Sequence, residues 1–129
     1  MAMWMKFAWV ACGGAFGAMA RYGTGLLAQK WVGTSYPWGT VIANMIGCFL
    51  MGTLFALSTR GIAIQHEHAK LLLMVGFLGS FTTFSSFALD NVVLAKDQTV
   101  GTMLFNVGLQ NILGVALVAL AIWLVHQLF

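Results

Sequence analysis

The chain has 129 residues, of which 60% are hydrophobic and only 7% are charged. A water-soluble fold needs more polar residues than this to cover its surface, so the composition excludes a soluble domain and predicts an integral membrane protein. The net charge of +3 comes from lysines and arginines that are scattered singly, with no cluster that follows a phosphate backbone. We therefore expect membrane lipid around the protein and no nucleic acid as a partner.

Four apolar stretches are each long enough to cross a bilayer, which takes about 20 helical residues. Turn-forming residues lie between the first two, and Lys96 and Asp97 end the third. Polar residues fill the segment 60–70, which predicts a loop there. The sequence predicts an all-α integral membrane protein with a single four-span domain over residues 1–129. The expected spans are 4–27, 38–58, 71–94 and 100–128.

In the first span, Gly13, Gly17 and Arg21 are four residues apart and share one helix face. The two glycines form a GxxxG pair, which lets another helix backbone approach closely. A guanidinium near hydrocarbon costs on the order of 2.5–3.5 kcal/mol unless it reaches the interface or faces water. Arg21 therefore either snorkels to the membrane surface or lines a cationic vestibule that gathers anions.

Amide side chains recur within the second and fourth spans, where their polar groups must find partners. One interpretation is hydrogen bonding that holds the helices together. The other is a polar, hydrated track between the helices, which three amides on one helix favour. The residues concerned are Thr40, Asn44 and Gly47 in the second span, and Asn106, Gln110, Asn111 and Gly114 in the fourth.

The third span contains an unusual run from Gly76 to Phe87, with two glycines followed by five hydroxyl residues between Ser80 and Ser86. Glycine is a poor helix former, and serine and threonine compete with the helix for backbone hydrogen bonds. The run predicts a helix that is broken near mid-membrane, where freed carbonyls become ion ligands. The alternative is an unbroken helix whose hydroxyls bond to their own backbone.

Three phenylalanines, Phe81, Phe84 and Phe87, follow one another at intervals of three in this span. Such a stripe often packs in a core. Its ring edges are positively polarised, however, so they also contact an anion without supplying a full charge.

The charges barely distinguish the two sides of the predicted bundle. A small difference gives little orientational bias under the positive-inside rule, so we expect insertion in both orientations and an antiparallel dimer. One side holds Lys6, Arg60 and Lys70, and the other holds Lys30, Lys96 and, near a span end, Arg21.

These motifs resemble the Fluc (CrcB) fluoride channels over nearly the whole chain. The matching residues are Gly13-Gly14, Gly17-Ala18, Arg21-Tyr22, Trp38-Gly39-Thr40, Asn44, Gly47 and the run from Gly76 to Phe87. The resemblance implies an antiparallel, dual-topology homodimer with two pores. It also implies a multi-pass protein of the bacterial plasma (inner) membrane that exports fluoride passively and relieves fluoride toxicity.

The resemblance also assigns roles to individual residues. It implies that the ring edges of Phe84 and Phe87 line the fluoride path and that Asn44 donates a hydrogen bond to the ion. It implies a structural sodium ion (Na+) at the dimer interface, held by the backbone carbonyls of Gly79 and Thr82. The remaining predicted pathway residues are Thr40, Thr83, Ser85, the vestibule residue Arg21, and the fourth-span amides Asn106 and Gln110.

Two other functions compete with this one. A small multidrug-type transporter also uses four spans and antiparallel dimers, but it needs a carboxylate in the first span, and here only Asp90 in the third span is available. A structural subunit of a larger membrane complex would explain the glycines and amides by packing alone. The sequence contains no Ser/His/Asp set, P-loop or metal-ligand cluster, so we expect no enzyme.

Overall fold

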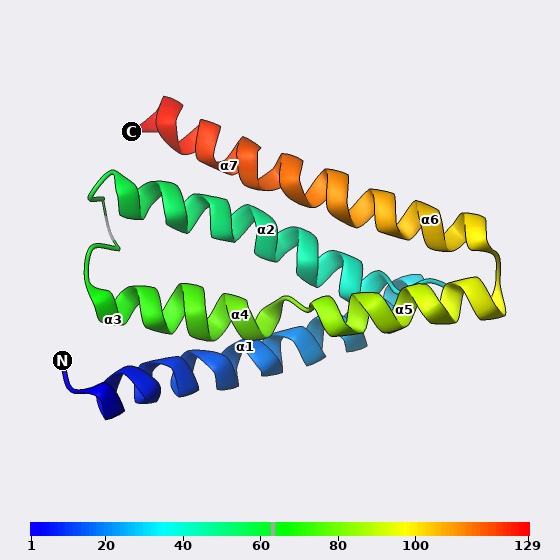
Figure 1. The fold of residues 1–129 in the computed structure, drawn as a ribbon, viewed down its shortest axis with the longest axis horizontal. Coiled ribbons are helices and arrows are strands. Elements are labelled where there is room, and N and C mark those ends of the chain that lie inside the picture. The colour runs from blue at the N-terminus through cyan, green and yellow to red at the C-terminus, as the bar shows by residue number, and fades with distance from the viewer. Residues whose placement is uncertain (63) are drawn as a thin grey trace.

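The computed structural model describes residues 1–62 and 64–129, and these form helices joined by short connections (Figure 1). The chain runs through α1 (Met3–Val32), α2 (Trp38–Thr59), a compound third helix and a compound fourth helix. The predicted all-α class is confirmed. The third helix comprises α3 (Glu67–Lys70), the π-helical η1 (Leu71–Leu78), α4 (Gly79–Phe81) and α5 (Phe84–Asp97). The fourth comprises α6 (Val100–Gly108), the π-helical η2 (Leu109–Leu113) and α7 (Gly114–Leu128).

Among the residues that the structure describes, three helices are long and apolar enough to cross a membrane: Trp38–Thr59, Glu67–Asp97 and Val100–Leu128. The first helix, α1, has 30 residues but is not among these three. Its glycines and polar residues, including Arg21 and Gln29, lower its mean hydropathy. The prediction of membrane-spanning helices is thus confirmed for three, while a crossing by α1 stays a prediction.

Two predicted boundaries are wrong. Helix α1 continues to Val32 instead of ending at residue 27, and it stops where Gly33 has a φ of 94°, a conformation that glycine adopts without strain. The segment 60–70 is not a loop throughout, because α3 begins at Glu67, whose carboxylate favours a helix N-terminus. Residue 63 of that predicted loop lies outside the described residues.

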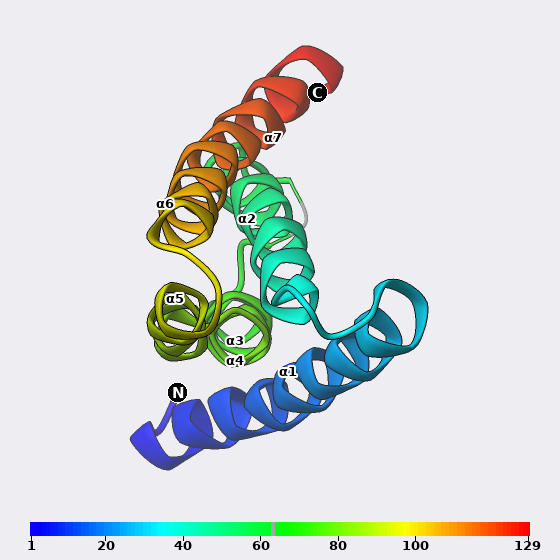
Figure 2. The ribbon, with the colours of Figure 1, turned by 90° about the vertical axis from the view of Figure 1, so that its right-hand side faces the viewer.

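Close packing of α1 against η1 depends on glycines, as the GxxxG pair predicted. A Cβ atom at Gly13 would overlap the carbonyl oxygen of Leu72, and one at Gly17 would overlap that of Phe77. From the other side, a Cβ at Gly76 would lie 2.7 Å from the Val10 carbonyl oxygen. Figure 2 shows α1 crossing beneath the third helix, so these backbones meet directly.

Helical geometry is interrupted between α4 and α5. Thr82 (φ −83°, ψ 161°) and Thr83 (φ −153°, ψ 125°) have extended backbones. Thr83 then starts α5 as its N-cap, because its hydroxyl oxygen accepts a hydrogen bond from the Ser86 N–H at 3.1 Å. The depth of this interruption in a bilayer stays a prediction.

The phenylalanine stripe separates at this interruption. Phe81 is buried with Ala43 and Leu78 in the core and stacks on Phe77, with ring centroids 5.7 Å apart. Phe84, on the other side of the interruption, is 79% exposed. The three rings therefore do not form one continuous wall, and only Phe84 and Phe87 stay together, at a centroid distance of 5.8 Å.

Candidate functional site

The side chain of Asn44, in α2, both accepts a hydrogen bond from the backbone of the interruption and donates one to it. The Thr83 N–H donates to Asn44 Oδ1 at 2.8 Å, and Asn44 Nδ2 donates to the Thr83 carbonyl at 3.1 Å. A side-chain amide thus replaces the helical partners that the extended backbone has lost. Each such bond contributes about 0.5–1.5 kcal/mol, and leaving one of its groups unpaired and away from water costs more.

A chain of amides continues from Asn44 into the protein. Asn44 Nδ2 donates a second bond to Gln110 Oε1 at 2.7 Å, and Gln110 Nε2 donates to Asn106 Oδ1 at 3.1 Å. Asn106 Nδ2 donates to Asn91 Oδ1 at 2.7 Å. Asn106, Gln110 and Asn91 are 0%, 7% and 9% exposed, so these bonds are largely shielded from solvent.

Tyr36, in the connection between α1 and α2, supplies one more bond to this chain. Its hydroxyl donates to Asn106 Oδ1 at 2.8 Å. Burial raises the pKa of the Tyr36 hydroxyl, so the group keeps its proton and remains a donor. Neither Tyr36 nor Asn91 was predicted from the sequence. An aromatic residue beside a turn and an asparagine in an apolar helix were the available signals.

One cavity brings together most of the predicted pathway residues. It has a volume of about 320 Å³ and lies between α2, the interruption and the π-helical segment η2. The exposed ring of Phe84 and the neighbouring ring of Phe87 line it together with polar side chains. Its predicted pathway and metal-site residues are Asn44, Thr82, Thr83, Phe84, Phe87 and Gln110.

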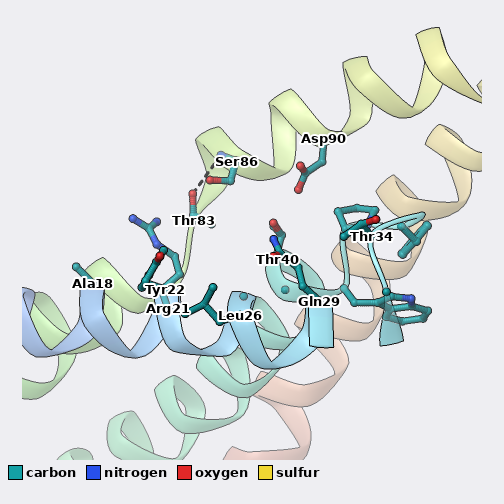
Figure 3. Close-up of a pocket in the computed structure, with 16 residues that line it drawn as sticks. Ala18, Arg21, Tyr22, Leu26, Gln29, Thr34, Thr40, Thr83, Ser86 and Asp90 are labelled. Atoms are coloured by element: carbon teal, nitrogen blue, oxygen red, sulfur yellow. Dashed lines mark hydrogen bonds between the residues drawn. The ribbon is translucent and has the colours of Figure 1, made fainter. Parts of the chain in front are cut away.

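A second cavity, of about 450 Å³, lies between α1, the start of α2 and α5. Figure 3 shows the Arg21 side chain at its edge, with Thr40 and Asp90 facing one another farther in. Thr83 lines this cavity as well as the first, so the two cavities meet at the interruption. Polar groups therefore extend from the opening beside Arg21, past Thr40 and Asp90, to the phenylalanine rings.

Of the other predicted residues, Ser85 and Asn106 lie outside both cavities, and Thr40 lines the larger one. Ser85 is exposed, with its hydroxyl 3.4 Å from that of Thr83. Asn106 is fully buried and is connected to the smaller cavity by its bond from Gln110 and to the larger one by its bond from Tyr36. Thr40 lies in the cavity beside Arg21, apart from the phenylalanines.

The carbonyls of Gly79 and Thr82 have lost their usual helical donors. In a continuous α-helix they would accept from the N–H groups four residues later, on Thr83 and Ser86. Here the Thr83 N–H donates to Asn44 and the Ser86 N–H donates to the Thr83 hydroxyl. The two carbonyl oxygens of the predicted metal site are thus released from the helix, which suits a hard cation that prefers oxygen ligands.

Comparison with known proteins gives a consistent match. A family model described as "CrcB-like protein, Camphor Resistance (CrcB)" matches residues 8–122. A protein of Aeromonas salmonicida named "Fluoride-specific ion channel FluC" is 47% identical over 90% of this chain and 92% of its own length. Proteins with the same name from Salinibacter ruber and Acidobacterium capsulatum are each 39% identical. Those matches cover 90% and 93% of this chain, and 86% and 92% of the relatives.

Proposed function

The chain belongs to the CrcB-like family, and on this premise we propose that it is a fluoride-selective channel that lets fluoride leave the cytoplasm passively and so relieves fluoride toxicity. The observation that carries the proposal is the match to relatives named as fluoride channels over about nine-tenths of the chain. The family makes the chain a multi-pass membrane channel rather than an enzyme. It does not favour a drug transporter or a structural subunit.

The proposed path begins at Arg21, whose charge attracts anions into the larger cavity. The ion then passes Thr40 and Thr83, and Thr83 also lines the smaller cavity with the phenylalanines. There the ring edges of Phe84 and Phe87 and the hydroxyl of Ser85 lie along its way. Gln110 lines the smaller cavity directly, and the buried Asn106 accepts a hydrogen bond from the Gln110 amide.

Fluoride is small and strongly hydrated, so a selective pore must replace its water with short hydrogen bonds. In the smaller cavity, where none of the described lining residues is charged, hydroxyls, an amide N–H and polarised ring edges provide these contacts. Binding of moderate strength is needed because the ion must also leave. A larger chloride ion would gain less from the same donors.

Fluoride efflux from vesicles tests the function directly. Purified protein is placed in liposomes loaded with potassium fluoride, valinomycin is added, and external fluoride is followed with an electrode. We expect efflux well above that of protein-free vesicles, and little efflux of chloride from vesicles loaded with potassium chloride. Equal fluoride efflux with and without protein would disprove the channel function.

Replacing a pathway ring tests the ring-edge contact. Phe84→Ile or Phe87→Ile should lower flux by up to about tenfold, because isoleucine has no polarised edge. This takes the edge–anion contact as comparable to an edge-to-face contact between two rings, about 0.5–1.5 kcal/mol. Phe55→Ile, on an exposed ring of α2, is the matched control. Wild-type flux in both pathway variants would contradict the ring-edge role.

We also propose that two copies pair with opposite orientations in the bacterial inner membrane, each pore using both. Several observations support pairing: Phe84 is 79% exposed in the single chain, and the two ends of the bundle differ little in charge. Figure 1 places the N-terminus, the end of α2, the start of α3 and the C-terminus at one end of the bundle. An antiparallel partner would bring its interruption alongside that of the first copy.

Such a dimer would hold a sodium ion between the released carbonyls of Gly79 and Thr82 from both copies. The ion would neutralise backbone dipoles in the interface.

In detergent with sodium, the protein should have the mass of two chains by light scattering. Replacing sodium with N-methyl-D-glucamine should lower its melting temperature. A monomeric mass would contradict the dimer, and a melting temperature independent of sodium would contradict the ion site.

A further inference from the structure

The positions of the oxygen and nitrogen of the Asn44 side-chain amide follow from a neighbouring backbone N–H, a group that can only donate a hydrogen bond. The backbone N–H of Thr83 lies 2.8 Å from Asn44, so the atom that it meets is the amide oxygen. The other end of Asn44 is therefore its NH₂ group. Both hydrogens of that NH₂ group are in use, one on the Thr83 carbonyl and one on Gln110 Oε1. No amide hydrogen of Asn44 is left for an anion in this state.

The orientation of the Asn44 amide in turn determines the orientation of the Gln110 side-chain amide. Since its oxygen accepts from Asn44, its NH₂ group faces Asn106 and must find an acceptor there, the Asn106 oxygen at 3.1 Å. Asn106 is held in that direction by its own donation to Asn91 and by the hydroxyl of Tyr36. Gln110 is thus tethered at its nitrogen, with its oxygen directed at the NH₂ group of Asn44.

The surroundings of Gln110 allow that oxygen to move. Gln110 lies in η2, where a π-helical turn replaces the α-helix, and its side chain lines the cavity of about 320 Å³ that contains Phe84 and Phe87. By contrast, Asn44 is restrained by two bonds to the Thr83 backbone. Of the two partners in the Asn44–Gln110 bond, Gln110 is the one that can turn away.

We propose that the carbonyl oxygen of Gln110 is a built-in competitor of the permeating anion for the Asn44 N–H, an inference that rests on the proposed fluoride channel. An arriving fluoride displaces this oxygen and takes its hydrogen bond. When the ion moves on, the oxygen returns, so the Asn44 donor is satisfied in both states. Binding then exchanges one hydrogen bond for another, which keeps the site from holding the ion too tightly.

Removing the competitor should strengthen fluoride binding. In Gln110→Leu, which keeps a side chain of similar size, the half-saturating fluoride concentration for single-channel current in planar bilayers should fall by about three- to tenfold, the equivalent of one net hydrogen bond. Gln127→Leu, the same change at an exposed position near the end of α7, should leave it unchanged. An unchanged value in Gln110→Leu, the result for a packing role, or a raised value, the result for a direct fluoride donor, would overturn the inference.

An infrared measurement tests the displacement without relying on transport. In protein carrying carbon-13 at its glutamine side-chain carbonyls, fluoride should shift one carbonyl band upward as Gln110 loses its bond from Asn44. This difference band should be absent in Gln110→Leu and present in Gln127→Leu. Efflux from wild-type vesicles with no such band would disprove the displacement and leave the channel function standing. Absence of both efflux and band would disprove the two together.

Discussion

Asn44→Asp is expected to lower fluoride flux by at least about a hundredfold. The carboxylate still accepts from the Thr83 N–H, but it donates nothing to the Thr83 carbonyl or to Gln110, so oxygens face oxygens at both places. Its charge also repels the ion. Two like charges about 4 Å apart at an effective dielectric constant of about 20 repel by about 4 kcal/mol, and each 1.4 kcal/mol is about a factor of ten.

Efflux from vesicles containing equal amounts of protein measures this effect. Gln127→Glu makes the same change from amide to carboxylate at an exposed end of α7 and should conduct like the wild type. Size-exclusion chromatography shows whether each variant assembles normally. Flux within threefold of wild type in an assembled Asn44→Asp protein would show that Asn44 does not lie on the path.

Gly17→Ala is expected to destabilise the protein by about 1–3 kcal/mol or more, the usual cost of overpacking. The new Cβ would overlap the carbonyl oxygen of Phe77 and lie 2.9 Å from its carbonyl carbon. Backbone atoms cannot rotate away as a flexible side chain would. Helix α1 would have to move away from η1, and the opening beside Arg21 would move with it.

The matched control lies on the same helix. A Cβ at Gly23 meets nothing within 4 Å, so Gly23→Ala should stabilise α1 by about 0.8–1.0 kcal/mol, the difference in helix propensity. Thermal unfolding in detergent, followed by circular dichroism, compares the two variants. A Gly17→Ala protein as stable as Gly23→Ala would refute the proposed backbone contact between α1 and η1.

Much of the fold was predictable because its signals are local. Apolar stretches identified the membrane-spanning helices, and the spacing of Gly13 and Gly17 identified the face of α1 that meets η1. The extension of α1 to Val32 was missed because its last turns are only moderately apolar. The early start of α3 was missed because its polar first turn reads like a loop.

The site was predictable in its residue types but not in its bonding. The amides and hydroxyls were evident, yet periodicity does not tell which amide bonds to which backbone group. Tyr36 reaches Asn106 from 70 residues away in the chain, a contact with no local signature. The hydrogen bonds between Asn44 and the Thr83 backbone likewise depend on how α2 packs against the third helix.

The π-helical segment η2 gives the fourth helix a tolerance of changes in length. Deleting a residue from an ordinary α-helix turns everything after it by about 100°. A π turn holds an extra residue, so losing one from Leu109–Leu113 would restore α-helical spacing while the faces of α6 and α7 keep their directions. The cost would fall on Gln110, whose place on the cavity wall depends on that extra residue. The fourth helix would still form after the deletion, but the hydrogen bond between Gln110 and Asn44 would be lost.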